Sequence, residues 1–222
     1  MGFPEIKERK SDSGILVVIC GRSGAGKDET AKNFIEKTVM SYSKVVTCAT
    51  RSPELRNGEM EVHGKHYHFV STEELFRMHA EGELVEVPVQ TGKEGDYKAT
   101  PKSEFVDVLQ GKKKVWLVDL TLAIKIVEGD YFDKQFEPDV AKQLRERTVV
   151  IYIDVDQQTL IDRRVKRDGE SYNPSRYETR DGQEIALLEK HGHKFQVKLP
   201  NPDDRQEETV LKLINIVSNI IK

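Results

Sequence analysis

The stretch ILVVICGRSGAGKDET, residues 15–30, decides the fold. It opens on an apolar run that predicts a buried strand, and apolar side chains at helical spacing continue from Asp28 to Met40. Between these segments, Gly21 to Lys27 fits the pattern GxxxxGK, in which glycines turn successive backbone N–H groups inward at the start of a helix. Such N–H groups and a helix N-terminus together attract phosphate. The order of strand, glycine-rich turn and helix therefore predicts a phosphate-binding P-loop, with Lys27 reaching the terminal phosphates.

Asp28 departs from the usual P-loop pattern, which has Ser or Thr after the lysine. The usual hydroxyl ligates Mg²⁺ without adding charge, whereas a carboxylate brings a negative charge next to phosphate. Two interpretations of Asp28 are open. Either it is a direct Mg²⁺ ligand, or it is a first-turn acidic residue favoured by the helix dipole, with Mg²⁺ held through water.

The 222-residue chain has the composition of one charge-rich globular domain, with 37% apolar and 33% charged residues. No apolar run approaches the roughly 18 residues that a membrane span requires. The formal charge of -3 argues against a nonspecific nucleic-acid coat. The N-terminus lacks the apolar segment of a signal peptide, so we expect a cytoplasmic protein that binds small molecules rather than nucleic acid or membrane. Cys20 and Cys48 lie near the ends of β-rich runs and are expected in the core without a disulfide.

Strand and helix patterns alternate along the chain, which predicts one α/β domain over residues 14–222 after a flexible polar tail at 1–13. A polar, arginine-rich stretch inside residues 157–192 predicts a loop with helical stems. The other predicted strands are 44–50, 65–70, 83–89, 114–120 and 148–155, and the other predicted helices are 28–40, 71–82, 102–111 and 138–147. A closing helix is predicted from one apolar stripe of Val210, Leu213, Ile214, Val217, Ile220 and Ile221.

Further segments follow the P-loop in an informative order. They are ATR at 49–51, RNGE at 56–59, GKHYHF at 64–69, LVE at 84–86, DYKAT at 96–100 and GKKKVWLVD at 111–119, with the arginine-rich stretch after them. Together they resemble the guanylate kinases, whose P-loop is followed by T-T-R, R-x-G-E, G-x-x-Y-x-F, an acidic strand, a Tyr-Gly-Ser/Thr turn, a strand ending in Asp and an arginine-rich lid. The resemblance implies a P-loop NTPase-type parallel sheet flanked by helices, an inserted nucleoside-monophosphate-binding lobe at about 47–100 and a lid at about 163–182.

The resemblance also implies an activity and a set of site residues. The family transfers the γ-phosphoryl group of ATP to GMP or dGMP with Mg²⁺, giving ADP and GDP or dGDP. The expected oligomeric state is a monomer or a homodimer. The residues implied for ATP are Gly21, Arg22, Ser23, Gly24, Ala25, Gly26, Lys27, Asp28 and Glu29, and those for Mg²⁺ are Asp28 and Asp119. The acceptor residues are Thr47, Arg51, Arg56, Glu59, Tyr67, Glu86, Tyr97, Thr100 and Asp119, and the catalytic residues are Lys27, Arg163, Arg167 and Arg180.

The implied residue types suit this chemistry. Arg51 and Arg56 offer forked N–H pairs to a monophosphate, and tyrosine hydroxyls can complete the cage around its oxygens. Glu86 can accept hydrogen bonds from the adjacent N1–H and N2–H groups of guanine, a pair of donors that adenine lacks. Thr47 matches the serine that donates to guanine O6 in the family.

The DYKAT segment departs from the family pattern. Lys98 and Ala99 stand where the family has Gly and Ser, so Thr100 could supply the missing hydroxyl. The acceptor therefore stays open between GMP or dGMP and another (deoxy)nucleoside monophosphate. A connection at 128–146 is also longer than in the family and has no assigned function.

The sequence also bears on an interaction module and on a zinc site. Some guanylate-kinase-like domains are catalytically inactive protein-interaction modules that lose the P-loop lysine and the lid, whereas this chain keeps Lys27 and the lid arginines. His63, His66 and His68 lack the distal ligand pair of a zinc site, so a metal is not expected there.

Overall fold

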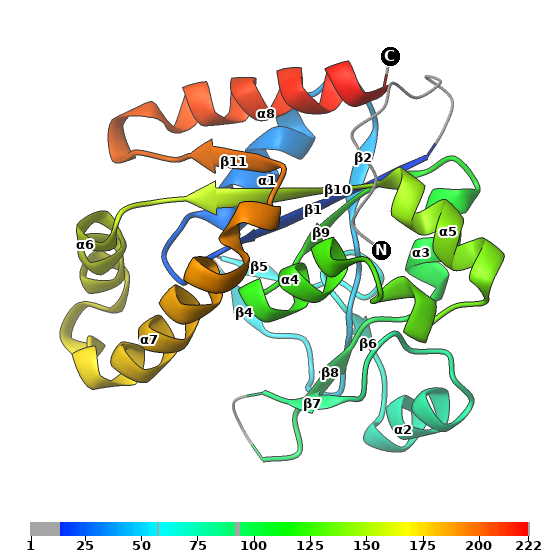
Figure 1. The fold of residues 1–222 in the computed structure, drawn as a ribbon. Coiled ribbons are helices and arrows are strands. Elements are labelled where there is room, and N and C mark those ends of the chain that lie inside the picture. The colour runs from blue at the N-terminus through cyan, green and yellow to red at the C-terminus, as the bar shows by residue number, and fades with distance from the viewer. Residues whose placement is uncertain (1–13, 57, 92–93, 222) are drawn as a thin grey trace.

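The structure, a computed structural model, describes residues 14–56, 58–91 and 94–221. The predicted tail at 1–13 lies outside these residues. The described part forms a parallel sheet with helices on both faces and a smaller lobe below it (Figure 1). The expected α/β fold, with a parallel central sheet flanked by helices, is therefore confirmed. No helix in these ranges is long and apolar enough to cross a membrane.

The central sheet has five strands in the order β11–β10–β1–β9–β2, and its neighbouring strands are parallel. Every residue of β1 is buried, which suits its middle position because both faces of that position are covered. The glycine-rich loop therefore leaves the sheet at its centre. The strands are β1 (Ile15–Gly21), β2 (Tyr42–Lys44), β9 (Lys113–Leu117), β10 (Thr148–Asp154) and β11 (Val197–Pro200).

Alternate residues of β1 face two helical layers (Figure 1). Leu16 and Val18 pack with apolar side chains of α3, α4 and α5, whereas Ile15 and Val17 pack with those of α1 and α8. The predicted closing helix is confirmed as α8, whose stripe lies in the second layer. The helices of the two layers are α1 (Lys27–Lys37), α3 (Ser103–Leu109), α4 (Leu120–Glu128), α5 (Pro138–Arg147) and α8 (Gln206–Ile221).

The segment expected to form the inserted lobe carries a second sheet and one helix. Its four short strands run in the order β6–β3–β8–β7, and β4 and β5 form a separate hairpin. A small cluster of Cys48, Leu75, Leu84 and Ala99 is the buried apolar centre of this lobe. The elements are β3 (Cys48–Ala49), β4 (Leu55–Arg56), β5 (Glu59–Met60), β6 (His68–Phe69), α2 (Thr72–Ala80), β7 (Val89–Gln90) and β8 (Tyr97–Ala99).

The predicted helical stems are α6 (Gln157–Asp168) and α7 (Pro174–His191), which project from one end of the sheet (Figure 1). Both cysteines are buried and free, as predicted. Short 3₁₀ helices complete the described chain as η1 (Phe132–Lys134), η2 (Gly169–Ser171), η3 (Gly192–Lys194) and η4 (Asp203–Arg205).

Several elements differ from the sequence predictions. Helix α1 ends at Lys37 because Thr38 is extended, and Val39, expected on its apolar stripe, is 100% exposed. The strands predicted at 44–50, 65–70 and 83–89 shrink to the two-residue strands β3, β6 and β7. Helix α4 was missed, although the polar residues of LTLAIKIVE, Thr121, Lys125 and Glu128, follow the i, i+4, i+7 spacing of a helix face. The short strands β2 and β11 were also missed.

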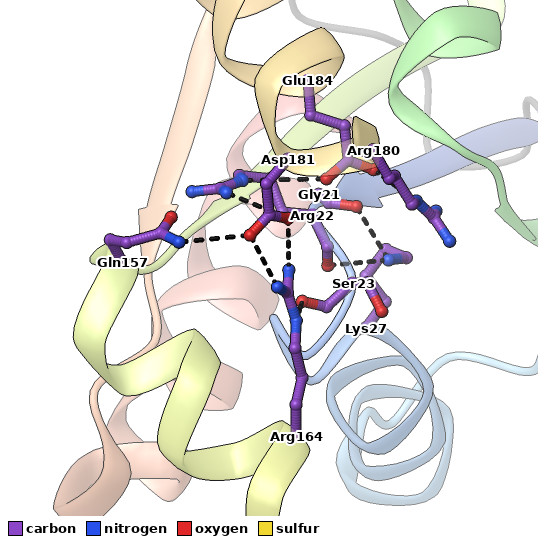
Figure 2. A network of polar contacts seen from close by, with 9 residues as sticks. All are labelled: Gly21, Arg22, Ser23, Lys27, Gln157, Arg164, Arg180, Asp181 and Glu184. Carbon is purple, nitrogen blue, oxygen red and sulfur yellow. Dashed lines mark hydrogen bonds and ion pairs between the residues drawn. The ribbon is translucent and has the colours of Figure 1, made fainter. Parts of the chain in front are cut away.

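A buried network of ion pairs holds α6 and α7 against the glycine-rich loop (Figure 2). Arg164, 1% exposed, donates to both carboxylate oxygens of Asp181 at 2.7 and 2.8 Å and to the Ser23 carbonyl at 2.9 Å. Arg22 of the loop lies 3.2 Å from the same Asp181 and 3.7 Å from Glu184. We call Arg22, Arg164, Asp181 and Glu184 the loop–lid network. Its two arginines and two carboxylates balance in charge, which is what allows them to be buried together.

Replacement of Asp181 by Asn tests this network. Burial alone would raise the pKa of the Asp181 carboxyl, but the hydrogen bonds of Arg164 and Gln157 and the charges of Arg164 and Arg22 lower it to about 2. The carboxyl therefore stabilises the fold above its unfolded pKa of 3.8, and this contribution is lost as the pH falls toward 2. Because Asp181→Asn leaves two buried arginines with one carboxylate, we expect it to lower the free energy of unfolding at neutral pH by about 3–5 kcal/mol.

Urea unfolding at pH 7 and at pH 3 measures both effects. The exposed Glu178→Gln in the same helix is the matched control and should change stability by no more than about 0.5 kcal/mol. Equal stability of wild type and Asp181→Asn at pH 7 would contradict a structural role for the network.

Candidate active site

The glycine-rich loop has the backbone geometry of an anion site. Gly24 and Gly26 have φ values of 88° and 84°, which side chains other than glycine rarely adopt. A Cβ atom at Gly26 would lie 2.7 Å from the amide nitrogen of Asn201, so a larger residue does not fit. Gly26 precedes α1 and no side chain caps this helix, which leaves its first-turn N–H groups open to a ligand.

Lys27 folds back onto the loop. Its ammonium donates to the carbonyls of Gly21 and Arg22 at 2.7 and 3.1 Å (Figure 2). Burial lowers the pKa of Lys27, and the negative charge of Asp28 opposes this shift. The positive charge of Arg180 lowers it further, so the two cations lie near each other. A phosphate anion placed in the loop would relieve the crowding of these positive charges.

Asp28 lies at the solvent surface. Its carboxylate is 87% exposed and 3.8 Å from the Lys44 ammonium, and a pair this exposed stabilises little. Within the described ranges, no group of three His, Cys, Asp or Glu side chains could hold a metal ion. Mg²⁺ commonly keeps several waters and binds one or two carboxylates together with substrate phosphates. The exposed carboxylate beside the loop thus fits an Mg²⁺ ion that enters with a nucleotide, bound directly or through water.

Arg163, the first predicted lid arginine, supports the loop from outside. Its guanidinium donates to the carbonyls of Gly24 and Ala25 at 3.3 and 3.2 Å. It also donates to the Asn201 carbonyl at 2.7 Å and pairs with Asp203 at 2.6 Å. All three guanidinium nitrogens are engaged, so Arg163 is bound to the protein rather than open to a reacting phosphate.

The other two predicted lid arginines point in different directions. Arg167 pairs with Asp168 at 2.9 Å and donates to the Tyr177 hydroxyl at 2.7 Å, near the tip of the stems. Arg180 donates to Glu184 at 2.9 Å (Figure 2). It also lines a cavity of about 900 Å³ together with Asp119. Of the predicted lid arginines, Arg180 is the one that the structure brings near both Asp119 and Lys27.

A second cavity, of about 700 Å³, adjoins the loop at Gly26. One side of it comes from the segment after β11, which the sequence analysis did not assign to the site. In that segment Asn201 is buried and donates to the Ala25 carbonyl at 2.8 Å. No motif marks these residues, and only the pairing of β10 with β11 brings them to the loop. The cavity is lined by Gly26, Asp162, Arg163, Lys166, Arg167, Asp203, Asp204 and Gln206.

A third cavity, of about 650 Å³, lies between the lobe and the central sheet. We call it the acceptor cavity because four predicted acceptor residues line it, namely Thr47, Glu86, Thr100 and Asp119. A bridge between Leu84 and Pro101 holds the Glu86 segment beside the end of β8. The walls nearest the core are apolar, with Val85 and Trp116 among them. Such a cavity suits a flat ring with polar edges.

Glu86 is the least satisfied group in the acceptor cavity. The Thr100 N–H donates to its Oε1 at 2.7 Å, whereas Oε2 is buried and has no hydrogen bond within the described chain. Burial raises the pKa of Glu86, although hydrogen bonds from Thr100 and from the nearby Tyr131 hydroxyl oppose the shift. A buried carboxylate oxygen without a donor is costly, and a ligand with N–H groups would remove that cost.

Asp119 lies where two cavities meet, since it lines both the acceptor cavity and the cavity that contains Arg180. Its Oδ1 accepts the Leu122 N–H at 2.8 Å and caps helix α4. The helix cap explains its fixed position between the two sides of the site.

The connection at 128–146 supplies residues that the sequence analysis missed. Tyr131 and Gln135 line the acceptor cavity, and Tyr131 is buried with its hydroxyl donating to the Val85 carbonyl at 3.3 Å. Burial raises the pKa of Tyr131. A tyrosine in a loop carries no motif, so its place depends on how α4 and α5 pack.

The described residues predicted to bind the acceptor phosphate contact other side chains of the lobe. Arg51 donates to both oxygens of Glu61 at 2.5 and 2.8 Å, and its guanidinium lies 5.1 Å from the centre of the Tyr67 ring. Tyr97 instead packs its ring against Phe76 of α2, with centres 5.1 Å apart. The structure thus brings Arg51 and Tyr67 together but turns the ring of Tyr97 toward α2.

Other predicted residues of the lobe lie in its hairpin and turn. Glu59 is exposed in β5 opposite Arg56, whose side chain lies outside the described part of the chain. His63 and His66 accept the backbone N–H groups of Phe69 and Val62 at 3.1 and 2.9 Å. These histidines therefore shape the turn before β6.

Known proteins resemble this chain in sequence. The family model described as guanylate kinase matches residues 13–219. Guanylate kinase from Clostridium perfringens (strain SM101 / Type A) is 35% identical over 123 residues, which are 55% of this chain and 53% of that protein. The chain thus spans about half the length of the first curated relatives that it matches. Guanylate kinase from Chlamydia felis is 28% identical over 97% of this chain and 94% of its own length.

A solved structure, the crystal structure of guanylate kinase from Anaplasma phagocytophilum, covers 93% of this chain and 86% of that chain. Its TM-score is 0.56 and its sequence identity is 23%, a likeness that concerns the fold alone. The family match, by contrast, extends over almost the whole chain and includes the loop, the lobe and the stems described above. The chain belongs to the guanylate kinase family.

Proposed function

We propose that the protein is a guanylate kinase that transfers the γ-phosphoryl group of ATP to GMP or dGMP, giving ADP and GDP or dGDP. The observation that carries the proposal is the buried, half-satisfied Glu86 carboxylate in a cavity that shares Asp119 with the cavity lined by Arg180. Membership of the family and the names of the relatives support phosphoryl transfer to a guanine nucleotide.

Guanine is the base whose hydrogen-bond donors best match the Glu86 carboxylate. Its adjacent N1–H and N2–H groups can donate to a carboxylate together, and one of them would satisfy the buried Oε2. A base without this pair would leave the carboxylate buried and unpaired, and sites of this kind reject such ligands strongly.

On the donor side, the chain provides charge and position. Phosphoryl transfer depends mostly on alignment and on neutralising the charge of the transferred group. The loop N–H groups and Lys27 would bind the phosphates of ATP, and Arg180 would add a cation beside Asp119, where the two cavities meet. Mg²⁺ that enters with ATP would offset charge on the β- and γ-phosphates, with Asp28 or its bound water as the protein contact. The loop–lid network keeps α7, and therefore Arg180, next to the loop.

An assay of ADP release across GMP, dGMP, AMP, CMP, UMP and dTMP tests the proposal. We expect turnover with the two guanine nucleotides. Lys27→Ala should lower kcat by at least about 10²-fold, because it removes a cation that stabilises the transferred charge. Lys32→Ala, exposed on the same helix, is the matched control and should leave kcat unchanged. Absence of turnover with all six acceptors would contradict the proposed kinase activity and favour an inactive interaction module. Turnover only with a nucleotide of another base would show that the acceptor is not a guanine nucleotide.

Exchange of Glu86 for Gln tests base recognition. Gln has one acceptor oxygen and turns an N–H₂ group toward the donors of guanine, so kcat/KM for GMP should fall by about 10- to 100-fold. Glu83→Gln, at an exposed position nearby, should have no effect. Because burial raises the pKa of Glu86 above 4.5, kcat/KM for GMP in the wild type should fall as the pH drops through that raised pKa. An equal loss for every acceptor base would show that Glu86 does not read the base.

A further inference from the structure

Strand β8 places Lys98, rather than Tyr97, in the acceptor cavity. Side chains alternate between the two faces of a strand. Ala99 is buried in the apolar cluster of the lobe, and Tyr97 packs against that cluster and against Phe76. Lys98 and Thr100 line the acceptor cavity instead. The family pattern assigns a phosphate contact to the tyrosine, but the direction of the side chains gives that place to the lysine.

The Lys98 ammonium sits on Tyr67, the other tyrosine expected at the acceptor phosphate. Its Nζ donates to the Tyr67 hydroxyl at 3.0 Å and lies 4.4 Å from the centre of the ring. Lys98 is half-buried, and it has no carboxylate partner in the described chain. A partly desolvated ammonium without a counter-charge is unfavourable, and an anionic ligand would supply the missing charge.

Arg51 differs from Lys98 in this respect. Its guanidinium is bound to both oxygens of Glu61 and lies 3.7 Å from Glu54. Its positive charge is thus already offset within the lobe, whereas that of Lys98 is not. The two cations stand at the same aromatic ring, because Arg51 lies 5.1 Å from the centre of Tyr67.

The pKa of Tyr67 reflects the positive charges around its hydroxyl. Burial alone would raise the pKa of its hydroxyl, but the hydrogen bond and charge of Lys98, with the charges of Lys44 and Arg51, lower it below the ordinary value. The surroundings of the hydroxyl therefore favour a negative charge, which a phosphate oxygen would bring.

We propose that Lys98 and the Tyr67 hydroxyl together bind the phosphate monoester of the acceptor nucleotide. The inference rests on the proposed function and adds a binding residue that the family pattern does not contain. Arg51, bound to Glu61, then packs over the Tyr67 ring. Tyr97 packs against the apolar cluster of the lobe instead. Glu86 and Lys98 would hold the two ends of the same ligand, the base and the phosphate.

Calorimetric titration of GMP and of guanosine separates the phosphate contact from the base contact. For Lys98→Met we expect the Kd of GMP to rise by about 10- to 100-fold, the usual worth of a hydrogen bond to a charged group. The Kd of guanosine, which has no phosphate, should stay unchanged. Lys98→Arg should keep most of the GMP affinity. Lys65→Met, which removes an exposed lysine of the same lobe, should leave both affinities at the wild-type value.

Steady-state kinetics should agree, with the KM of GMP raised in Lys98→Met and the KM of ATP unchanged. Tyr97→Phe separates the two assignments, and we expect it to bind GMP like the wild type. The inference is overturned if Lys98→Met binds GMP as tightly as the wild type, if it loses guanosine equally, or if the loss appears in Tyr97→Phe instead. A wild-type protein that binds neither GMP nor guanosine would overturn the proposed acceptor, and this inference with it.

Discussion

The hydrogen bonds of Arg164 are the constraint on which the rest of the site depends. A P-loop turns its N–H groups toward the ligand, so its carbonyls face the other way and need donors of their own. Here the arginines of α6 supply them, with Arg164 on the Ser23 carbonyl and Arg163 on those of Gly24 and Ala25. Because Arg164 also binds Asp181, one side chain sets both the shape of the loop and the place of α7.

The buried ion pairs of the loop–lid network fix the geometry of the loop and α7 more than they stabilise the fold. Replacing a buried ion pair by apolar groups often costs nothing, because desolvation offsets most of the attraction. An arginine, however, carries several donors in a rigid plane and can serve a carbonyl and a carboxylate at once. An apolar side chain in place of Arg164 would fill the space but leave the Ser23 carbonyl without this donor and Asp181 with only the weaker contacts of Arg22 and Gln157. Asp181 in turn keeps α7 in register, and with it Arg180.

The acceptor cavity has opposite charges along its wall. The Glu86 carboxylate has an unsatisfied oxygen, and the Lys98 ammonium has no counter-charge among the described residues. A ligand with N–H donors at one end and an anion at the other can enter in one orientation only, because the reverse places like groups together. The apolar walls of Val85 and Trp116 add little direction of their own, so in the proposed function these two polar groups would orient the ligand.

Local patterns were reliable where one segment contained the whole physical cause. The run before Gly21 became a fully buried strand, and the Ser71 hydroxyl caps α2 by accepting the Glu74 N–H at 3.1 Å. In α8, Val210, Leu213, Val217 and Ile220 of the apolar stripe are buried. Patterns failed where the cause lay elsewhere in the chain. Val39, for example, lies on the apolar stripe of the predicted helix but is exposed because the helix stops at Lys37.

The sequence by itself determined that a phosphate-binding loop follows a buried strand, because glycines, lysine and apolar run are neighbours in the chain. Its resemblance to the guanylate kinases also singled out Glu86 and Asp119 as acceptor residues. Tertiary structure decided which predicted lid arginine lines a cavity with Asp119, that Tyr131 lines the acceptor cavity, and that Lys98 rather than Tyr97 does so. The physical reason is that a side chain's direction depends on pairing and packing between distant segments, which no spacing along one segment records.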